Sequence, residues 1–440
     1  MKYDLFFQLA KEAGIEEAEL FIENTKAISF SLFHSKIDNY KISDATSIIA
    51  RGLVNGKFGA VTCDSWSKNK VKYIVDEIVK NAKAIENDDP QFIFEGSEKY
   101  HKFNRFNKEL AKVSVDEKIN KAKELEAAIK NFSPMIVEVP EVEYEEQEET
   151  ITLINSKGLK LTQKTNYFVF VGVALASDGK QSKSGYDLFV DNDFTKFSPK
   201  ELADKIGKET TEQLGGEPCE TKNYKAVLAP DVVASLMQAY LSSISAEEVQ
   251  KQSSLFIGKL GKPVASKLVT IEDKPISKNI FSRWFDDEGV ATSNKPLIKN
   301  GILQTYLYNL TTAAKDGVTS TGNGYRSGGS MSIAPSFLTF KHGKKSLDEL
   351  FEKVQNGVYI TDISGLHAGL NPQSGNFSLQ STGFLIENGK KTKGLDVITV
   401  SGNLVDLFND IIAVGNNVKI SPSGTSTPSV VVKKLNVTGK

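Results

Sequence analysis

Hydrophobic residues recur at two different spacings in the N-terminal part of the chain. Near the start they have helical spacing, which predicts an amphipathic helix from the positions Leu5, Phe6, Leu9 and Ala13. Residues 18–54 instead contain runs that alternate apolar and polar side chains, which predicts several short strands. The last run faces residues 57–64 across Asn55-Gly56, a dipeptide typical of two-residue hairpin turns. Helical spacing returns in residues 71–85, where we expect a second helix.

The next part of the chain is predicted to contain a loop, a helix and a meander. Residues 88–110 are aromatic, charged and aperiodic, so we expect a long surface loop. Ser114 and Glu117 form the pattern of a capping box, which predicts a helix running to about Phe132. From Ile136 to about Val190 the pattern is that of strands separated by turn-forming residues, which predicts an antiparallel meander.

Glutamates are concentrated where this meander begins, in the segment VEVPEVEYEEQEET at 137–150. We interpret them as the solvated face of a strand whose charges prevent edge-to-edge pairing. A cation site and a docking patch for a basic partner are the alternatives.

Helices and strands occur in blocks beyond residue 190. Ser198-Pro199 predicts the start of a helix that Gly215-Gly216 ends, and we place a domain boundary after it, between residues 1–217 and 218–440. In the second part, Pro230-Asp231 predicts the start of a helix and Asn300-Gly301 predicts a hairpin over 298–309. Three more helices are expected: one capped by Ser245 and Glu248, one near 346–354 and one near 403–411.

Blocks of strands and helices, without strict βαβ alternation, indicate the α+β class. We expect an N-terminal mixed α/β region that includes the antiparallel meander. A larger strand-rich C-terminal domain with antiparallel sheets should follow it.

Composition restricts the function classes. Hydrophobic residues make up 40% of the 440-residue chain, and the net charge of −1 provides no field to attract nucleic acid. No apolar run reaches membrane-spanning length, and the N-terminal helix lacks a cleavage site, so we expect no membrane segment and no signal peptide. Two distant cysteines, Cys63 and Cys219, favour a reducing compartment, and we predict a cytoplasmic protein.

The sequence contains no His-Glu-x-x-His, CxxC, phosphate loop, dinucleotide fingerprint or GxSxG motif. Three segments are distinctive because they interleave Gly, Asn, Ser and Asp with short apolar runs. They are FSRWFDDEG at 281–289, GLNPQSGNFSLQSTGFLIENG at 369–389 and VSGNLVDLFNDIIAVGNN at 400–417. Together they resemble the C-terminal half of the TldD/PmbA family, the modulator of DNA gyrase family, and most of all its TldE/PmbA branch.

The resemblance has an implication for metal binding. In zinc-bearing TldD-type subunits a helix carries His-Glu-x-x-x-His, and a cysteine near the C-terminus adds a ligand. The corresponding helix here is 232–243, where Leu236, Met237 and Ala239 cannot bind zinc. The tail segment at 421–429, SPSGTSTPS, has no cysteine. The resemblance therefore implies no cofactor in this chain and zinc on a partner subunit.

The function that the resemblance implies is that of a TldE/PmbA-like subunit of a cytosolic TldD/TldE-type metalloprotease complex acting on unfolded peptides. A zinc-bearing TldD-type homologue would be its partner in a heterodimer, and this chain would contribute cleft and dimer interface. The alternative is a non-catalytic peptide-binding or regulatory homodimer. A third interpretation is that the isolated chain binds a metal through carboxylates such as those of Asp286 and Asp287, whose oxygen ligands favour Mg or Ca, and cleaves peptides alone.

No residue is identified as catalytic, but several are candidate contacts of a substrate cleft. Arg283 can hold a peptide carboxylate in a bidentate pair, or form a salt bridge with its neighbouring acids. Asp286, Asp287 and Glu288 can bind a metal or orient a substrate amine. Alternatively, one of them caps a turn and the others face water.

The remaining candidates lie in Gly-rich segments. Asn323 and Arg326, in GNGYRSGG at 322–329, can face an extended peptide or form a plain turn. His367 is the only histidine beside a Gly-rich segment, and it is either catalytic or structural. Residues 377–381 predict a strand that either pairs with a peptide along its edge or lies inside a sheet.

Overall fold

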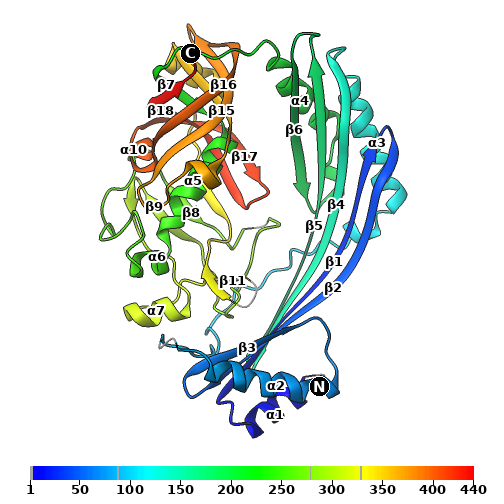
Figure 1. Ribbon diagram of the computed structural model, residues 1–440, viewed down its shortest axis with the longest axis vertical. Coiled ribbons are helices and arrows are strands. Elements are labelled where there is room, and N and C mark those ends of the chain that lie inside the picture. The colour runs from blue at the N-terminus through cyan, green and yellow to red at the C-terminus, as the bar shows by residue number, and fades with distance from the viewer. Residues whose placement is uncertain (1–2, 87–88, 278, 328–329) are drawn as a thin grey trace.

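The first half of the chain forms one long antiparallel sheet. The computed structural model describes residues 3–86, 89–277, 279–327 and 330–440. Sheet A has the strand order β3-β2-β1-β4-β5-β6, and its longer strands run most of the length of the molecule (Figure 1). Its strands are β1 (Glu17–Phe33), β2 (Lys36–Val54), β3 (Lys57–Cys63), β4 (Ile136–Asn155), β5 (Lys160–Ser177) and β6 (Ser182–Asp191).

The prediction of several short strands in residues 18–54 is wrong, because the structure contains two long ones. β1 and β2 pair continuously from Glu17 opposite Leu53 to Phe33 opposite Lys36, with one register shift after Ser31. The alternation of apolar and polar residues keeps the same phase from one run to the next. The polar residues that separate the runs therefore lie on one face of a continuous strand. The predicted turn at Asn55-Gly56 is confirmed between β2 and β3.

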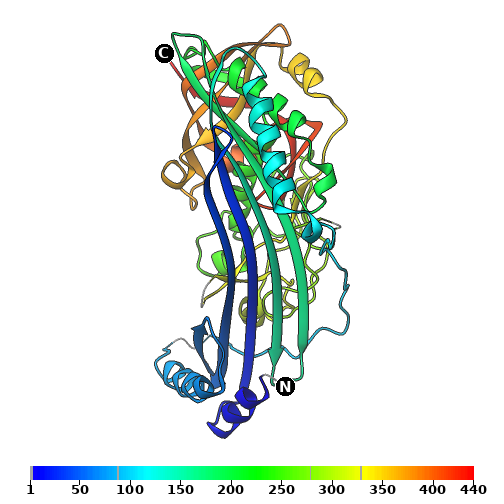
Figure 2. The same cartoon turned by 90° about the vertical axis from the view of Figure 1, so that its right-hand side faces the viewer.

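Helices cover one face of sheet A. α1 (Asp4–Glu12) and α2 (Lys68–Lys83) pack on even-numbered β1 and β2 residues such as Leu20 and Ile48. α3 (Val115–Lys130) and α4 (Pro199–Glu212) cover the far end of the same face, around Phe30 and Tyr144 (Figure 2). The predicted N-caps are confirmed, because Ser114 accepts from the Glu117 amide and Ser198 from that of Glu201. Met1 and Lys2, at the start of the predicted first helix, lie outside the described residues.

The second half is built on a mixed ten-stranded sheet B. Its strands β7, β14, β15, β16 and β18 close into a ring, because β7 pairs with both β14 and β18. Two pairings, β7 with β14 and β13 with β18, are parallel, and the others are antiparallel. The strands of sheet B are β7 (Lys222–Leu228), β8 (Ile271–Asp273), β9 (Lys295–Lys299), β10 (Ile302–Leu303), β13 (Leu338–Phe340), β14 (Gly357–Ser364), β15 (Asn376–Glu387), β16 (Lys390–Asn403), β17 (Ile411–Ser421) and β18 (Thr425–Thr438).

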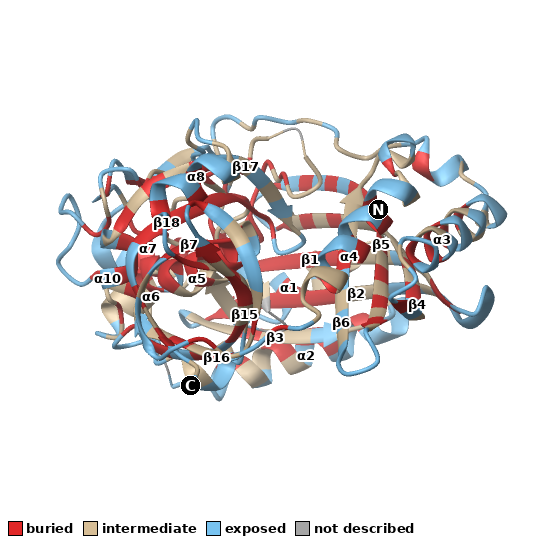
Figure 3. Ribbon diagram, turned by 90° about the horizontal axis from the view of Figure 1, so that it is seen from above, coloured by how far each residue is buried: buried red, intermediate tan, exposed pale blue. Residues whose placement is uncertain are grey.

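Short helices and one small hairpin complete this half. The helices are α5 (Pro230–Leu241), α6 (Ala246–Gln250), α7 (Leu310–Asp316), α8 (Leu347–Val354), α9 (Leu366–Gly369) and α10 (Leu404–Asn409). β11 (Gly324–Ser327) and β12 (Ser330–Ile333) form the hairpin. The predicted helix after Ser245 is present as α6 with Ser245 at its N-cap, but that side chain makes no capping bond, whereas Ser346 and Glu349 form a capping box in α8. Buried residues are concentrated in α5, β7 and β18 (Figure 3).

The two halves meet through an aromatic cluster on the odd-numbered face of sheet A. Trp284 and Phe285 pack against Phe21, Ile49 and strand residues of β4. The expected surface loop at 88–110 is only partly exposed, because Ile93 is fully buried and the aromatic side chains that follow it pack on this cluster. Asp88, at the start of that prediction, lies outside the described residues.

The α+β class predicted from the sequence is confirmed. The helices of the described residues are all too short or too polar to cross a membrane.

Candidate functional site

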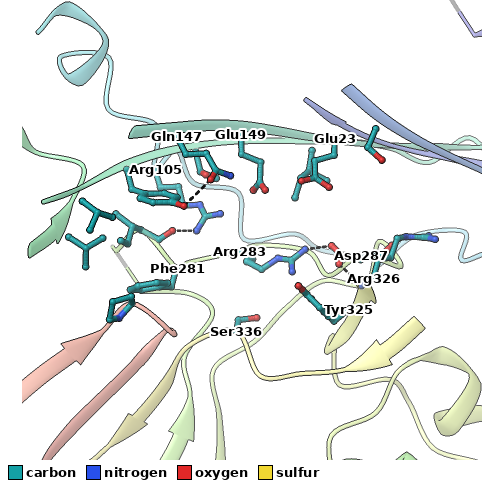
Figure 4. Close-up of a pocket in the computed structure, with 18 of the residues that line it drawn as sticks. Glu23, Arg105, Gln147, Glu149, Phe281, Arg283, Asp287, Tyr325, Arg326 and Ser336 are labelled. Atoms are coloured by element: carbon teal, nitrogen blue, oxygen red, sulfur yellow. Dashed lines mark hydrogen bonds and ion pairs between the residues drawn. The ribbon is translucent and has the colours of Figure 1, made fainter. Parts of the chain in front are cut away.

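A cavity of about 670 Å³ lies between sheet A and the loops of the second half. One wall comes from the odd-numbered face of sheet A and includes Glu23, Gln147 and Glu149 (Figure 4). The opposite wall comes from segments 280–287 and 325–326 and includes Arg283 and Asp287. The cavity is therefore built from parts of the chain that are far apart in sequence.

Asp286 holds the turn of the FSRWFDDEG segment. Its Oδ1 accepts the amides of Glu288 at 3.0 Å and Val290 at 2.9 Å, and its Oδ2 accepts the Gly324 amide at 2.8 Å. Burial raises the pKa of Asp286, and Glu288 raises it further, against these backbone donors. The side chain fastens the Gly-rich loop to the turn and does not line the cavity.

Asp287 connects two arginines at the cavity wall. Its Oδ1 accepts from the Arg283 guanidinium, and its Oδ2 accepts the Arg326 amide at 2.8 Å. The salt-bridge alternative for Arg283 is therefore the one that the structure contains. Burial lowers the pKa of Arg283, but Asp287 and the acids near it outweigh this effect and leave the pKa above its ordinary value.

Arg326 continues the charge network into sheet A. Its guanidinium donates to Glu19 at 2.5 Å, and Arg51 on β2 donates to the same oxygen at 2.7 Å. Glu19 is fully buried. Glu288 is also buried, and it accepts the Leu310 amide at 2.7 Å. The expectation that the acids beside the capping residue face water is thus wrong, because sheet A and the Gly-rich loop cover them.

Besides Asp286, two more predicted candidates lie outside the cavity lining. Asn323 is buried and donates to Asp273 at 2.8 Å and to the Ala334 carbonyl at 3.0 Å, which is a structural role. His367 lies exposed on α9. Residues 377–381 belong to β15, which is an internal strand between β14 and β16. Gly328 and Gly329 of the Gly-rich segment lie outside the described residues.

Most residues of the strand wall were not predicted from the sequence. β4 is an internal strand between β1 and β5, so its glutamates do not protect an edge, and that interpretation is wrong. Glu145, Gln147 and Glu149 instead face the cavity. Burial raises the pKa of Glu149, and nearby Glu23 raises it further. The period-two spacing of these residues is the signal that could have identified them.

Arginine usage is a second signal that was missed. Only four of the 54 basic residues are arginines. Arg105, Arg283 and Arg326 line the cavity, and Arg51 shares the Glu19 carboxylate with Arg326. An arginine keeps its charge when buried and presents a planar fork to oxygen acceptors, properties that lysine lacks. In a lysine-rich chain, the arginines mark this site.

α5 approaches the rim of the cavity. Pro422, in the turn between β17 and β18, lines the cavity, and the next residue, Ser423, accepts from Gln238 of α5 at 2.6 Å. Leu236 and Met237 of α5 are buried in the core of the second half. Among the described residues, no three His, Cys, Asp or Glu side chains are grouped so as to hold a metal ion.

Comparison with known proteins gives matches along nearly the whole chain. Residues 221–439 match the PmbA/TldA metallopeptidase C-terminal domain, 108–214 match the central domain of the same family, and 18–85 match its domain 1. The Metalloprotease PmbA homolog of Haemophilus influenzae is 23% identical over 98% of this chain and 94% of that protein.

Solved structures agree with these matches. A protein described as a modulator of a DNA gyrase, from Thermotoga maritima, is 32% identical with a TM-score of 0.92, covering 99% of both chains. TldE from Thermococcus kodakarensis has a TM-score of 0.91 at 22% identity over 100% of both chains, which shows the same fold. The domain matches and the Thermotoga relative together show that this chain is a metallopeptidase-like protein that belongs to the PmbA/TldD family.

Proposed function

We propose that this chain is a TldE/PmbA-type subunit of a cytoplasmic peptidase complex. A TldD-type homologue holds the zinc, and this chain supplies a wall of the peptide cavity and part of the dimer interface. The unfolded peptide is the substrate.

The observation that carries the proposal is the position and chemistry of α5. This is the helix that corresponds, by resemblance, to the zinc helix of TldD-type subunits. Here Gln238 connects it to the turn that lines the cavity. Zinc sites in proteins use thiolate, imidazole or carboxylate ligands. At the cavity rim α5 offers the amide of Gln238, a group outside that set of zinc ligands.

The carboxylates of Asp286 and Asp287 are unsuitable as an alternative metal site. All four carboxylate oxygens of Asp286 and Asp287 accept hydrogen bonds from protein groups. A metal ion would have to displace a buried guanidinium or backbone amides. We therefore do not assign metal binding by this chain alone to those carboxylates.

The size and charges of the cavity suit an extended chain. Sites for small ligands have volumes of about 300–1,000 Å³. The 670 Å³ cavity lies within that range, so it accepts a peptide segment and excludes a folded domain. Its walls carry both acids and arginines, which can pair with peptide ends, side chains or backbone groups.

Co-expression with a TldD-type homologue from the same genome tests the function. We expect the two chains to co-purify, zinc to be found by elemental analysis at one ion per heterodimer, and unfolded peptides to be cleaved only by the mixture. The matched control is the homologue with its His-Glu-x-x-x-His helix disabled, which should still co-purify but not cleave.

Two results would decide against the heterodimer. If the chains do not associate, and the homologue cleaves peptides equally well alone, the subunit role is wrong. If the isolated chain is a homodimer that binds peptides, and the homologue does not change this, the regulatory alternative replaces it.

A further inference from the structure

Arg105 differs from the other three arginines of the chain in how its charge is balanced. The other three are each paired with a buried carboxylate, as described above. The Arg105 guanidinium donates to the backbone carbonyl of Ile280, and among the described residues it makes no ion pair. Its Nε atom is buried and has no hydrogen-bond partner among the described residues. A buried donor without a partner is costly, so it points to an acceptor that binds there.

Asparagine side chains hold the backbone at Arg105 and just after it. Asn192 donates to the Arg105 carbonyl at 2.7 Å, and Asn107 donates to the Asn192 carbonyl at 2.6 Å. Asn166 on β5 accepts the Asn107 amide and donates to the Asn107 carbonyl, both at 2.8 Å. The arginine is thus presented by a fixed backbone although it lies in a segment without helix or strand. Pre-ordering of this kind is what a binding residue requires.

The surroundings of Arg105 in the cavity combine an arginine that has no ion pair among the described residues with apolar surface. Burial lowers the pKa of Arg105 to about 9, and the positive charge of Arg283 contributes to the decrease. Beside it on β5 and β6, the cavity lining continues with Val169, Leu188 and Val190. A ligand group that is negative and adjoins an apolar side chain would satisfy both features.

We propose that Arg105 anchors a carboxylate of a peptide bound in this cavity, next to a subsite for an apolar side chain. This inference deepens the proposed peptide-binding function and rests on it. The carboxylate has two sources in a peptide, the C-terminus and an Asp or Glu side chain, and both present the same planar pair of oxygens to the guanidinium.

Glu149 has the opposite effect to Arg105 on the binding of a carboxylate. It lies on β4 opposite Thr165, the β5 residue with which the Arg105 backbone pairs, and each affects the pKa of the other. Its negative charge repels an incoming carboxylate. Removal of that charge therefore strengthens carboxylate binding, whereas removal of the Arg105 charge weakens it. Changes of opposite sign distinguish a binding role from general damage to the fold.

Calorimetric titration of the purified full-length chain tests the anchor. Three short N-acetylated peptides serve as probes: one ending in leucine as the free acid, the same peptide as the C-terminal amide, and an amide with aspartate in place of that leucine. We expect the free acid to bind at least about tenfold more tightly than the leucine amide. The aspartate amide shows whether a side-chain carboxylate is accepted as well.

The variants make the test specific. Arg105→Met should abolish the preference for the acid, and Glu149→Gln should increase affinity for it. Lys108→Met, which removes an exposed charge from the same loop, should behave like wild type. The anchor is wrong if wild type binds neither acid nor aspartate peptide, if it does not distinguish them from the leucine amide, or if Arg105→Met keeps the preference. These measurements use the isolated chain, so failure of the heterodimer would leave their outcome unaffected.

Discussion

At the scale of single residues, the charges of the cavity fall into two groups. Asp287 and Arg283 neutralise each other, and Glu19 is shared by Arg51 and Arg326. Glu149, by contrast, makes no hydrogen bond or ion pair among the described residues. Unpaired charged groups in a partly buried site are more costly to the folded state than paired ones, and they are available to a ligand.

The raised pKa of Glu149 leads to a prediction about stability. Burial is the main cause and Glu23 the second, while Arg283 and Arg105 oppose them and Asp287 adds to them. Because the pKa is higher in the folded state, the folded chain binds the extra proton. Stability therefore falls as the pH rises from about the ordinary glutamate value of 4.5 through the folded-state pKa.

Glu149→Gln should consequently raise the melting temperature near pH 8 and change it little near pH 5. Thermal unfolding followed by circular dichroism at both pH values measures this. Glu141→Gln, an exposed position on the same strand, is the control and should change the melting temperature near pH 8 less than Glu149→Gln does. An equal shift of the Glu149 variant at both pH values would contradict the assignment.

At the scale of elements, the two faces of sheet A have different tasks. Even-numbered residues of β1 pack on helices, as Leu20 and Phe30 do. Odd-numbered residues such as Phe21 and Glu23 face the second half and its cavity. The alternation of side chains along a strand therefore separates the hydrophobic core from the site without any additional structural device.

The contact of β3 with α2 shows how closely the helix layer is packed. A Cβ atom on Gly59 would lie 1.8 Å from the Ile78 carbonyl oxygen of α2, where no real contact is possible. Gly59→Ala must push the helix away and should lower the free energy of unfolding by about 2–3 kcal/mol.

Urea unfolding at equilibrium measures that loss. Gly394→Ala is the control, because its Cβ would have no neighbouring atom closer than 3.3 Å, and it should cost less than about 1 kcal/mol. Similar losses in the two variants would contradict close packing at Gly59.

At the scale of the whole molecule, the halves are linked by an aromatic cluster and by charge pairs. Glu19 of sheet A and Arg326 of the second half form a buried pair. At the other end of the interface, Lys419 pairs with Asp187 of β6 at 2.8 Å. The cavity lies between these links, so its shape depends on the positions of both halves.

Glu19→Gln should weaken this link strongly. It leaves the guanidinium groups of Arg51 and Arg326 buried without their shared carboxylate, at a cost of about 3–5 kcal/mol. We expect a matching decrease in the free energy of unfolding in urea. Glu141→Gln should remain within about 0.5 kcal/mol of wild type. A Glu19 variant as stable as this control would show that the pair does not stabilise the interface.

Local signals in the sequence predicted most elements of the fold. Ser198-Pro199 marked the start of α4, and Asn55-Gly56 marked the β2–β3 turn, because capping and turn formation involve neighbouring residues. The same reasoning predicted short strands where β1 and β2 are long, since strand length depends on a partner strand. Of the candidate residues, Arg283, Asp287 and Arg326 line the cavity, whereas Asp286, Asn323 and His367 do not.

The sequence by itself determined the α+β class, the helix starts and the three Gly- and Asn-rich segments that relate the chain to its family. These properties reside in spacing and in local backbone preference. Only the tertiary structure decided which charges converge. Glu19 and Arg326 are separated by 307 positions in the chain. Their contact depends on strand register and on how the two halves dock, and no local pattern encodes either of these.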